Sequence, residues 1–279
     1  RPDPNHPFLL VNGLVTVADN LEADPGQNYN LTAPLDYVPF EEELKIGYIV
    51  RENVEVGRVI VFGGKGITID DILKAVEIKE NGIVGIDAPK SGVYKNGYMV
   101  RHLGYGINPN VQVPTLLRKT GNPVSLIGKM ADVIECEDAE YLPMVETEKV
   151  IDLVCDKLKT QKSGLIAANV QETDLAGHSQ DPVLYANKLM TVDERLPEIV
   201  SLLTDEDLFI ITGDHGNDPT IGHSHHTREK ALLLVYGKKL ISHSLGVRQT
   251  LSDIGATIAD YMKVSKPANG TSFLQELLD

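Results

Sequence analysis

The chain has 279 residues, 42% of them hydrophobic, which is enough to bury one large core or the cores of two ordinary domains. Its formal net charge of −14 argues against nucleic acid as a partner, because non-specific binding needs lysines and arginines to displace counterions from phosphates. The sequence contains neither a run of eighteen apolar residues nor a signal-peptide pattern, so we expect no membrane partner and a cytoplasmic location.

The first part of the chain, residues 1–112, is predicted to be an α+β domain of short strands separated by turns. One helix is predicted from a capping-box pattern, in which Thr68 offers a hydroxyl cap and Asp71, three residues on, offers a carboxylate. Short apolar runs predict strands at 8–11, 14–17, 46–50, 57–62 and 83–86.

Two stretches of this domain have both a functional and a structural interpretation. The glycine-rich residues 63–66 could cradle a phosphate, but they lack the spacing of a P-loop, so a tight loop between a strand and the capped helix is favoured. Arg101 and His102 could face a ligand, and an ordinary structural position is again the favoured interpretation.

From residue 113 to residue 279, strands and helices alternate, which is typical of the α/β class with a mostly parallel sheet between helices. The predicted strands lie at 124–128, 165–170, 208–212 and 231–236. The predicted helices lie at 114–119, 147–158 and 182–203, with a last one after a capping box at 250–253. Pro197 is expected to kink or divide the helix at 182–203, because proline has no amide proton to donate.

A first pair of metal-ligating residues follows the predicted strand at 165–170. Asp174 and His178 are four residues apart, so one helical turn places both side chains on the same face of a helix. A carboxylate and an imidazole at that spacing can hold one metal ion.

A second group follows the apolar strand at 208–212 directly. Asp214 and His215 come first, and three histidines lie shortly downstream: His223, His225 and His226. Mixed oxygen and nitrogen donors suit Zn²⁺ or Mn²⁺ better than Mg²⁺ or Ca²⁺, which prefer oxygen ligands alone.

The two groups of donors are expected to converge. Ligands of parallel sheets bind outside the carboxyl ends of the strands, and both groups fall just after such ends. Either group alone could be structural, because an Asp after a strand is often a helix cap and a lone His is often a surface residue. The coincidence of both groups favours a metal site.

Residues 214–220 and 226–229, together with the pair Asp174 and His178, resemble the metal-binding half of the alkaline phosphatase superfamily. Within it, they are most similar to the phosphopentomutases and the phosphopentomutase-like metalloenzymes. Shorter similar stretches lie at 56–60, 127–132 and 270–274. The resemblance implies an alkaline-phosphatase-like core at 113–279 and a cap domain at 1–112 that closes over the site.

The resemblance also implies a ligand set for two divalent metal ions, with Mn²⁺ favoured over Zn²⁺. The ligands of the first ion are Asp174, His178 and His226, and those of the second are Asp214 and His215. Lys129 matches a family lysine that is expected near the substrate phosphate, whereas His223 and His225 are left as spare residues.

The implied activity is that of a metal-dependent phosphomutase acting on a small phosphorylated sugar. Phosphate would move between positions 1 and 5 of a pentose through a phosphorylated Thr or Ser of the enzyme. The spacing of Asp174 and His178 is one residue tighter than is usual in phosphopentomutases and resembles the cofactor-independent phosphoglycerate mutases. A phosphoglycerate-mutase-like enzyme or a phosphatase on the same metal core is therefore the alternative.

Family members also carry a metal-ligating Asp on a first strand and the phosphorylated Ser or Thr at the following helix start. No residue before Phe8 matches either feature, so we expect the nucleophile to be missing and assign no catalytic residue. The chain resembles a mutase without its first hundred or so residues, and a non-catalytic metal-binding fragment is a further alternative.

Overall fold

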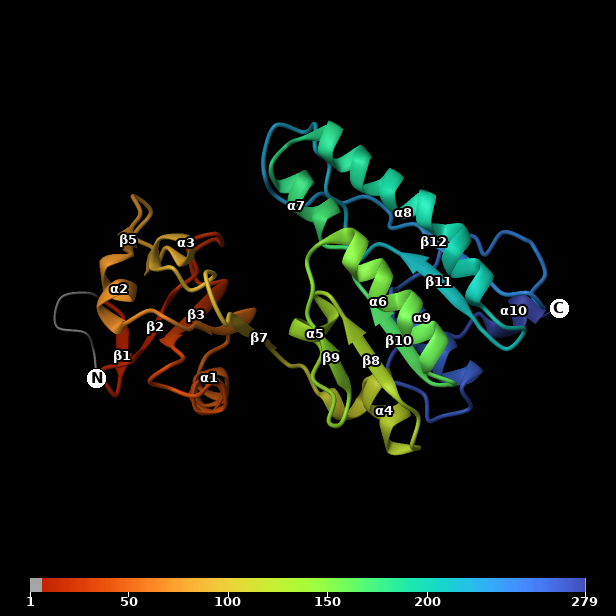
Figure 1. The fold of residues 1–279 in the computed structure, drawn as a ribbon, viewed down its shortest axis with the longest axis horizontal. Coiled ribbons are helices and arrows are strands. Elements are labelled where there is room, and N and C mark those ends of the chain that lie inside the picture. The colour runs from red at the N-terminus through yellow and green to blue at the C-terminus, as the bar shows by residue number, and fades with distance from the viewer. Residues whose placement is uncertain (1–6, 279) are drawn as a thin grey trace. The chain divides into compact units, whose positions relative to one another are not determined.

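The computed structural model describes residues 7–278 of the chain. The chain divides between Ile107 and Asn108 into two compact units (Figure 1). Both units combine sheets with helices, which confirms the α/β class. Among the described residues, no helix has both the length and the apolar character needed to cross a membrane.

The first unit is built on a mixed sheet. Its strands are β1 (Leu9–Val11), β2 (Val15–Asp19), β3 (Asn28–Pro34), β4 (Arg58–Gly64), β5 (Val76–Ile78), β6 (Val84–Ile86) and β7 (Met99–Gly104). They are arranged in the order β5-β6-β2-β3-β4-β7, and β1 pairs with β2. The pairs β3–β4 and β2–β6 are parallel and the other pairs are antiparallel.

Helices pack on this sheet through alternating residues of its strands. The helices are α1 (Phe40–Asn53), α2 (Ile69–Lys74) and α3 (Ala88–Ser91). Val61 of β4 belongs to the core that includes Phe40 of α1, whereas the next residue, Phe62, packs with Ile72 of α2. Successive strand residues point to opposite faces, so the sheet is covered on both sides.

The predicted strand at 46–50 is wrong, because these residues lie within α1. The buried positions of the helix, Phe40, Glu43 and Gly47, have helical spacing. A Cβ at Gly47 would collide with Val61, so the glycine lets the helix approach β4 closely. The apolar run that resembled a strand is thus shared between the inner and outer sides of a helix.

The capping box predicted before α2 is confirmed. The Asp71 amide donates to the Thr68 hydroxyl at 3.3 Å, and the Thr68 amide donates to the Asp71 carboxylate at 2.9 Å. The reciprocal bonds satisfy two amides that have no partner within the helix itself.

The second unit contains two small sheets. The first is parallel, in the order β10-β8-β9, and the second pairs β11 with β12 in antiparallel register. Their strands are β8 (Val124–Ile127), β9 (Glu140–Leu142), β10 (Leu165–Ala168), β11 (Phe209–Thr212) and β12 (Leu233–Tyr236). The helical elements are η1 (Pro109–Val111), α4 (Val113–Lys119), α5 (Met130–Val133), α6 (Thr147–Thr160), α7 (Glu172–His178), α8 (Pro182–Leu202), α9 (Ser252–Tyr261) and α10 (Leu274–Leu278).

Helices cover both faces of the parallel sheet in this unit (Figure 1). Val124 and Leu126 of β8 pack with Leu117 of α4 and Ala259 of α9. Ser125 lies between them in the strand, and its hydroxyl donates a hydrogen bond to Oε1 of Gln161, the C-cap residue of α6, at 2.7 Å. Helices α6 and α8 lie side by side, and their shared core also receives Phe209 of β11.

Three details of the second unit differ from the predictions. The strands predicted at 208–212 and 231–236 do not join a parallel sheet, because the loop between them contains no crossover helix and brings the chain back antiparallel. Helix α8 continues through Pro197, so the proline does not divide it, and the kink stays a prediction. The Pro197 ring lies on an exposed part of the helix. The capping box at 250–253 does not form, because Asp253 accepts from the Thr271 amide instead, at 2.8 Å.

Candidate metal centre

Helix α7 carries the first two donors of the site. The chain enters α7 soon after the carboxyl end of β10, and the one-turn spacing places His178 Nε2 at 3.3 Å from Asp174 Oδ1. Glu172, at the start of α7, accepts from the Thr147 amide at 2.7 Å and from Lys188 at 2.8 Å. These bonds attach the ligand-bearing helix to α6 and α8.

His226 supplies the third donor. Its Nε2 lies 3.3 Å from Asp174 Oδ1 and 3.1 Å from His178 Nε2. Within the described residues, these are the three donors that lie close enough together, within 4.8 Å, to hold one metal ion. Donors bound tetrahedrally at about 2.1 Å from an ion would be about 3.4 Å apart, so the geometry fits a metal such as Zn²⁺ or Mn²⁺.

The segment 214–227 brings His226 back to the strand end from which it started. The Thr227 amide donates to the Gly216 carbonyl at 2.9 Å and closes the segment through an isolated antiparallel bridge. The residues that flank this bridge therefore meet, and the His215 and His226 rings stack with centroids 3.6 Å apart. His223 and His225 remain on the exposed outer part of the loop.

The orientation of His178 is set by a backbone carbonyl. Its Nδ1 lies 2.6 Å from the Ser224 carbonyl oxygen, which can only accept a hydrogen bond. Nδ1 therefore donates to this carbonyl, and Nε2 faces the other two donors. This is the usual arrangement of a metal-ligating histidine.

The charges around Asp174 favour its ionised form. Burial by itself would raise the pKa of the carboxyl group, but the hydrogen bond from Asn217 and the charges of His178 and Lys129 outweigh it and lower the pKa. Lys129 Nζ lies 3.7 Å from Asp174 Oδ2.

The pKa of His226 is lowered by burial and by the neighbouring His215 imidazole. A carboxylate beside a neutral imidazole is the protonation state that a metal ion requires.

The second predicted pair lies next to the first three donors. His215 Nε2 is 3.5 Å from Asp214 Oδ2 and 3.9 Å from Asp174 Oδ1. The Asp214 side chain is 59% exposed, so it borders the site from the solvent side. The predicted residues thus gather in one place, and their assignment to two metal ions stays a prediction.

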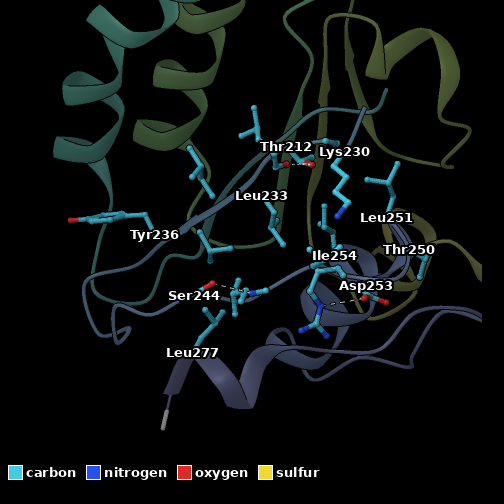
Figure 2. A pocket seen from close by; sticks show the side chains of 18 of the residues that line it. Thr212, Lys230, Leu233, Tyr236, Ser244, Thr250, Leu251, Asp253, Ile254 and Leu277 are labelled. Carbon is cyan, nitrogen blue, oxygen red and sulfur yellow. Dashed lines mark hydrogen bonds and ion pairs between the residues drawn. The ribbon is translucent and has the colours of Figure 1, made fainter. Parts of the chain in front are cut away.

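A cavity of about 810 Å³ borders the second pair. Asp214 and His215 line it together with β12 and the segment 240–251. Figure 2 shows Leu233 and Ile254, which provide apolar wall, and Lys230, which is among the charged lining residues. The volume falls within the range of small-molecule sites.

The sequence did not single out two groups that the structure places at the site. One is Asn217, which donates to Asp174, and the other is the Ser224 carbonyl. Asn217 belongs to the same run as Asp214 and His215, which was the available signal. A backbone carbonyl leaves no signal in a sequence.

The glycine-rich loop of the first unit fits its structural interpretation. The Gly66 amide donates to the Asp36 carboxylate at 2.6 Å and is therefore engaged within the unit. Gly64 lies against the Val93 backbone, with which a Cβ would collide. Arg101 and His102 lie within β7, opposite Val61 and Ile60 of β4.

Comparison with known proteins identifies relatives of the whole region around this site. Residues 83–266 match the family model of the metalloenzyme superfamily. The phosphopentomutase of Herpetosiphon aurantiacus is 41% identical over 184 residues, which cover 64% of this chain and 46% of that protein. The phosphopentomutase of Desulfitobacterium hafniense (strain DSM 10664 / DCB-2) is 33% identical over 260 residues, which cover 90% of this chain and 60% of that protein.

The phosphopentomutase of Deinococcus radiodurans is 37% identical over 175 residues, which cover 62% of this chain and 45% of that protein. The chain therefore spans about half the length of the curated relatives that it matches. Among solved structures, that of PH0037 protein from Pyrococcus horikoshii aligns with a TM-score of 0.38 at 20% identity, covering 72% of this chain and 63% of that chain.

Proposed function

The chain belongs to the metalloenzyme superfamily, and from this premise we propose that it is the metal-binding part of a phosphopentomutase-like phosphomutase. The observation that carries the proposal is the convergence of Asp174 Oδ1, His178 Nε2 and His226 Nε2 within 4.8 Å. Their origins, a helix after β10 and a loop after β11, support a site assembled for a metal ion.

In this proposal, Asp174, His178 and His226 hold one divalent ion, and Asp214 and His215 contribute to a second. When bound, such ions polarise a phosphate and stabilise its negative charge during transfer. Lys129 reaches the same place from the end of β8, and its ammonium group would bind a phosphate oxygen of the substrate.

The proposed reaction moves phosphate between positions 1 and 5 of a pentose through a phosphorylated Thr or Ser. No residue of this chain is assigned as that nucleophile. The curated relatives named phosphopentomutase are about twice as long as the matched region, so the reaction is proposed for the longer architecture.

Metal binding can be tested with two histidines of the same loop. His226→Ala removes a proposed ligand, and His225→Ala removes an exposed neighbour that the proposal leaves unused. We expect His226→Ala to weaken Mn²⁺ binding, measured by isothermal titration calorimetry, by more than the roughly 10–100-fold that loss of an outer partner of a ligand costs. The proposal fails if the wild-type chain binds neither Mn²⁺ nor Zn²⁺, or if both variants bind like wild type.

The substrate can be tested by incubating the metal-loaded chain with ribose 5-phosphate, phosphoglycerate and a generic phosphate ester. Any turnover should favour ribose 5-phosphate over the other two compounds, as the proposal of a phosphopentomutase-like site predicts. Turnover of ribose 5-phosphate at an enzymatic rate would show that the nucleophile is present. Turnover of phosphoglycerate alone would favour the phosphoglycerate-mutase-like alternative.

A further inference from the structure

We infer that Asn217 is a positioning residue that fixes the Asp174 carboxylate for the metal ion. The inference rests on the proposed metal site and adds a residue that contributes no ligand atom of its own. It acts through Asp174, and it does so from the loop that also carries Asp214 and His215.

The side-chain amide of Asn217 uses both of its protons on Asp174. Nδ2 lies 2.8 Å from Asp174 Oδ1 and 3.0 Å from the Asp174 backbone carbonyl. The opposite amide orientation would place an oxygen against these two acceptors, so the hydrogen bonds themselves establish which end is the donor.

The position of the amide is enforced by packing. A Cβ at Gly177 of α7 would collide with the Asn217 side-chain amide, so this glycine provides the space that Asn217 occupies. Asn217 Oδ1 is buried and has no hydrogen-bond partner among residues 7–278. An unpaired buried oxygen costs stability, which is expected where a side chain is placed for a function.

The bond from Asn217 reaches the oxygen that matters for the metal ion. Asp174 Oδ1 is the atom that lies 3.3 Å from both His178 Nε2 and His226 Nε2, whereas Oδ2 faces Lys129. A carboxylate free to rotate would direct Oδ1 at the two imidazoles for only part of the time. The amide prevents this rotation and so prepares the donor set in advance.

Gln180 provides a comparison within the same contact region. Its side chain donates to the Gly177 and Asp218 carbonyls, both at 3.0 Å, and accepts from the Gly222 amide at 2.7 Å. It therefore also joins α7 to the loop, but it makes none of these bonds with Asp174. If Asn217 only held the two segments together, loss of either side chain would have the same effect.

The test measures metal binding by Asn217→Leu, Asn217→Ala and Gln180→Ala. Leucine keeps side-chain volume against Gly177 without donating, and alanine avoids a clash if leucine prevents folding. Calorimetry measures the Mn²⁺ affinity, and the absorption spectrum of bound Co²⁺ reports the coordination geometry. Folding without metal is measured by thermal melting monitored with circular dichroism.

We expect the Asn217 variants to bind Mn²⁺ roughly 10–100-fold more weakly than wild type and to change the Co²⁺ spectrum. Gln180→Ala should retain the wild-type affinity and spectrum, even if its melting temperature falls. Wild-type affinity and spectrum in folded Asn217 variants would overturn the inference, as would an equal loss in Gln180→Ala. If the wild-type chain itself binds no metal, the proposed function fails first and the inference falls with it.

Discussion

At the scale of single residues, His178 and His226 illustrate how the site is assembled. Their Nε2 atoms are 3.1 Å apart although 48 positions separate them in the chain. Two imidazolium ions could not share this place without strong repulsion, so the pair requires at least one neutral ring. A cation bound as proposed would accept a lone pair from each ring and remove the conflict.

The protonation of His226 predicts how metal binding depends on pH. Its pKa lies below the ordinary value of 6.5, so the ring is neutral at pH 7 and its Nε2 is available. We expect the Mn²⁺ affinity to vary little above the ordinary histidine pKa of 6.5 and to fall at lower pH, where a proton competes for the ring.

Calorimetry at a series of pH values measures this effect, and His225→Ala should give the wild-type profile. An affinity that is the same at pH 5 as at pH 7 would contradict the assignment of His226 as a ligand. The pH dependence of folding has the same direction. An unfolded histidine with the ordinary pKa binds a proton more strongly than folded His226 does, so lowering the pH favours unfolding.

At the scale of elements, helix α1 contains a carboxyl group in an unusual place. Glu43 is fully buried between the helix and the sheet, and neither of its carboxylate oxygens has a partner in the described part of the chain. Burial raises its pKa from 4.5 to about 9, so the group is neutral in the folded protein at pH 7. The unfolded chain ionises it above pH 4.5, so rising pH favours unfolding.

Glu43→Gln should remove this pH dependence. In the wild type, the free energy of unfolding should fall by about 1.4 kcal/mol per pH unit between about pH 4.5 and pH 9 on account of this residue. Urea denaturation at pH 6 and pH 8.5 measures the slope. Glu42→Gln is the control and should keep the slope, because Glu42 is an exposed neighbour whose Oε1 lies 2.6 Å from Lys45 Nζ. An unchanged slope in Glu43→Gln would show that the carboxyl group is not buried as described.

At the scale of the whole molecule, each unit has hydrophobic cores of its own. Val15, Leu31 and Val61 belong to a core of the first unit, and Leu117 and Leu126 to a core of the second. The donors of the proposed metal site all belong to the second unit. Metal should therefore stabilise one unit and leave the other unchanged.

Scanning calorimetry should resolve two transitions. Saturating Mn²⁺ should raise the midpoint of one of them, by an amount equivalent to about 2.7 kcal/mol at a metal concentration of 100 times the Kd. Glu43→Gln at pH 8.5 should raise the midpoint temperature of the other transition. A single transition that responds to both changes would show that the units unfold together.

Part of this architecture follows from the sequence by itself. The spacing of Asp174 and His178 and the capping box at Thr68 were predictable, because helical periodicity and caps depend on residues a few positions apart. The placement of donors after the predicted strands 165–170 and 208–212 was also predictable, because short apolar runs indicate the strands and the donors follow them in the sequence. The strand predicted at 46–50 failed because a short apolar run fits either element until its packing partner, here Val61, is known.

Only the tertiary structure decided which distant groups meet. The bridge between Gly216 and Thr227 places His226 on His215 and leaves His225 outside, a choice that ligand spacing could not make. The contact of Asn217 with Asp174 likewise depends on the space at Gly177. Donor types and local geometry are properties of short segments, whereas the selection among donors is made by hydrogen bonds and packing between segments far apart in the chain.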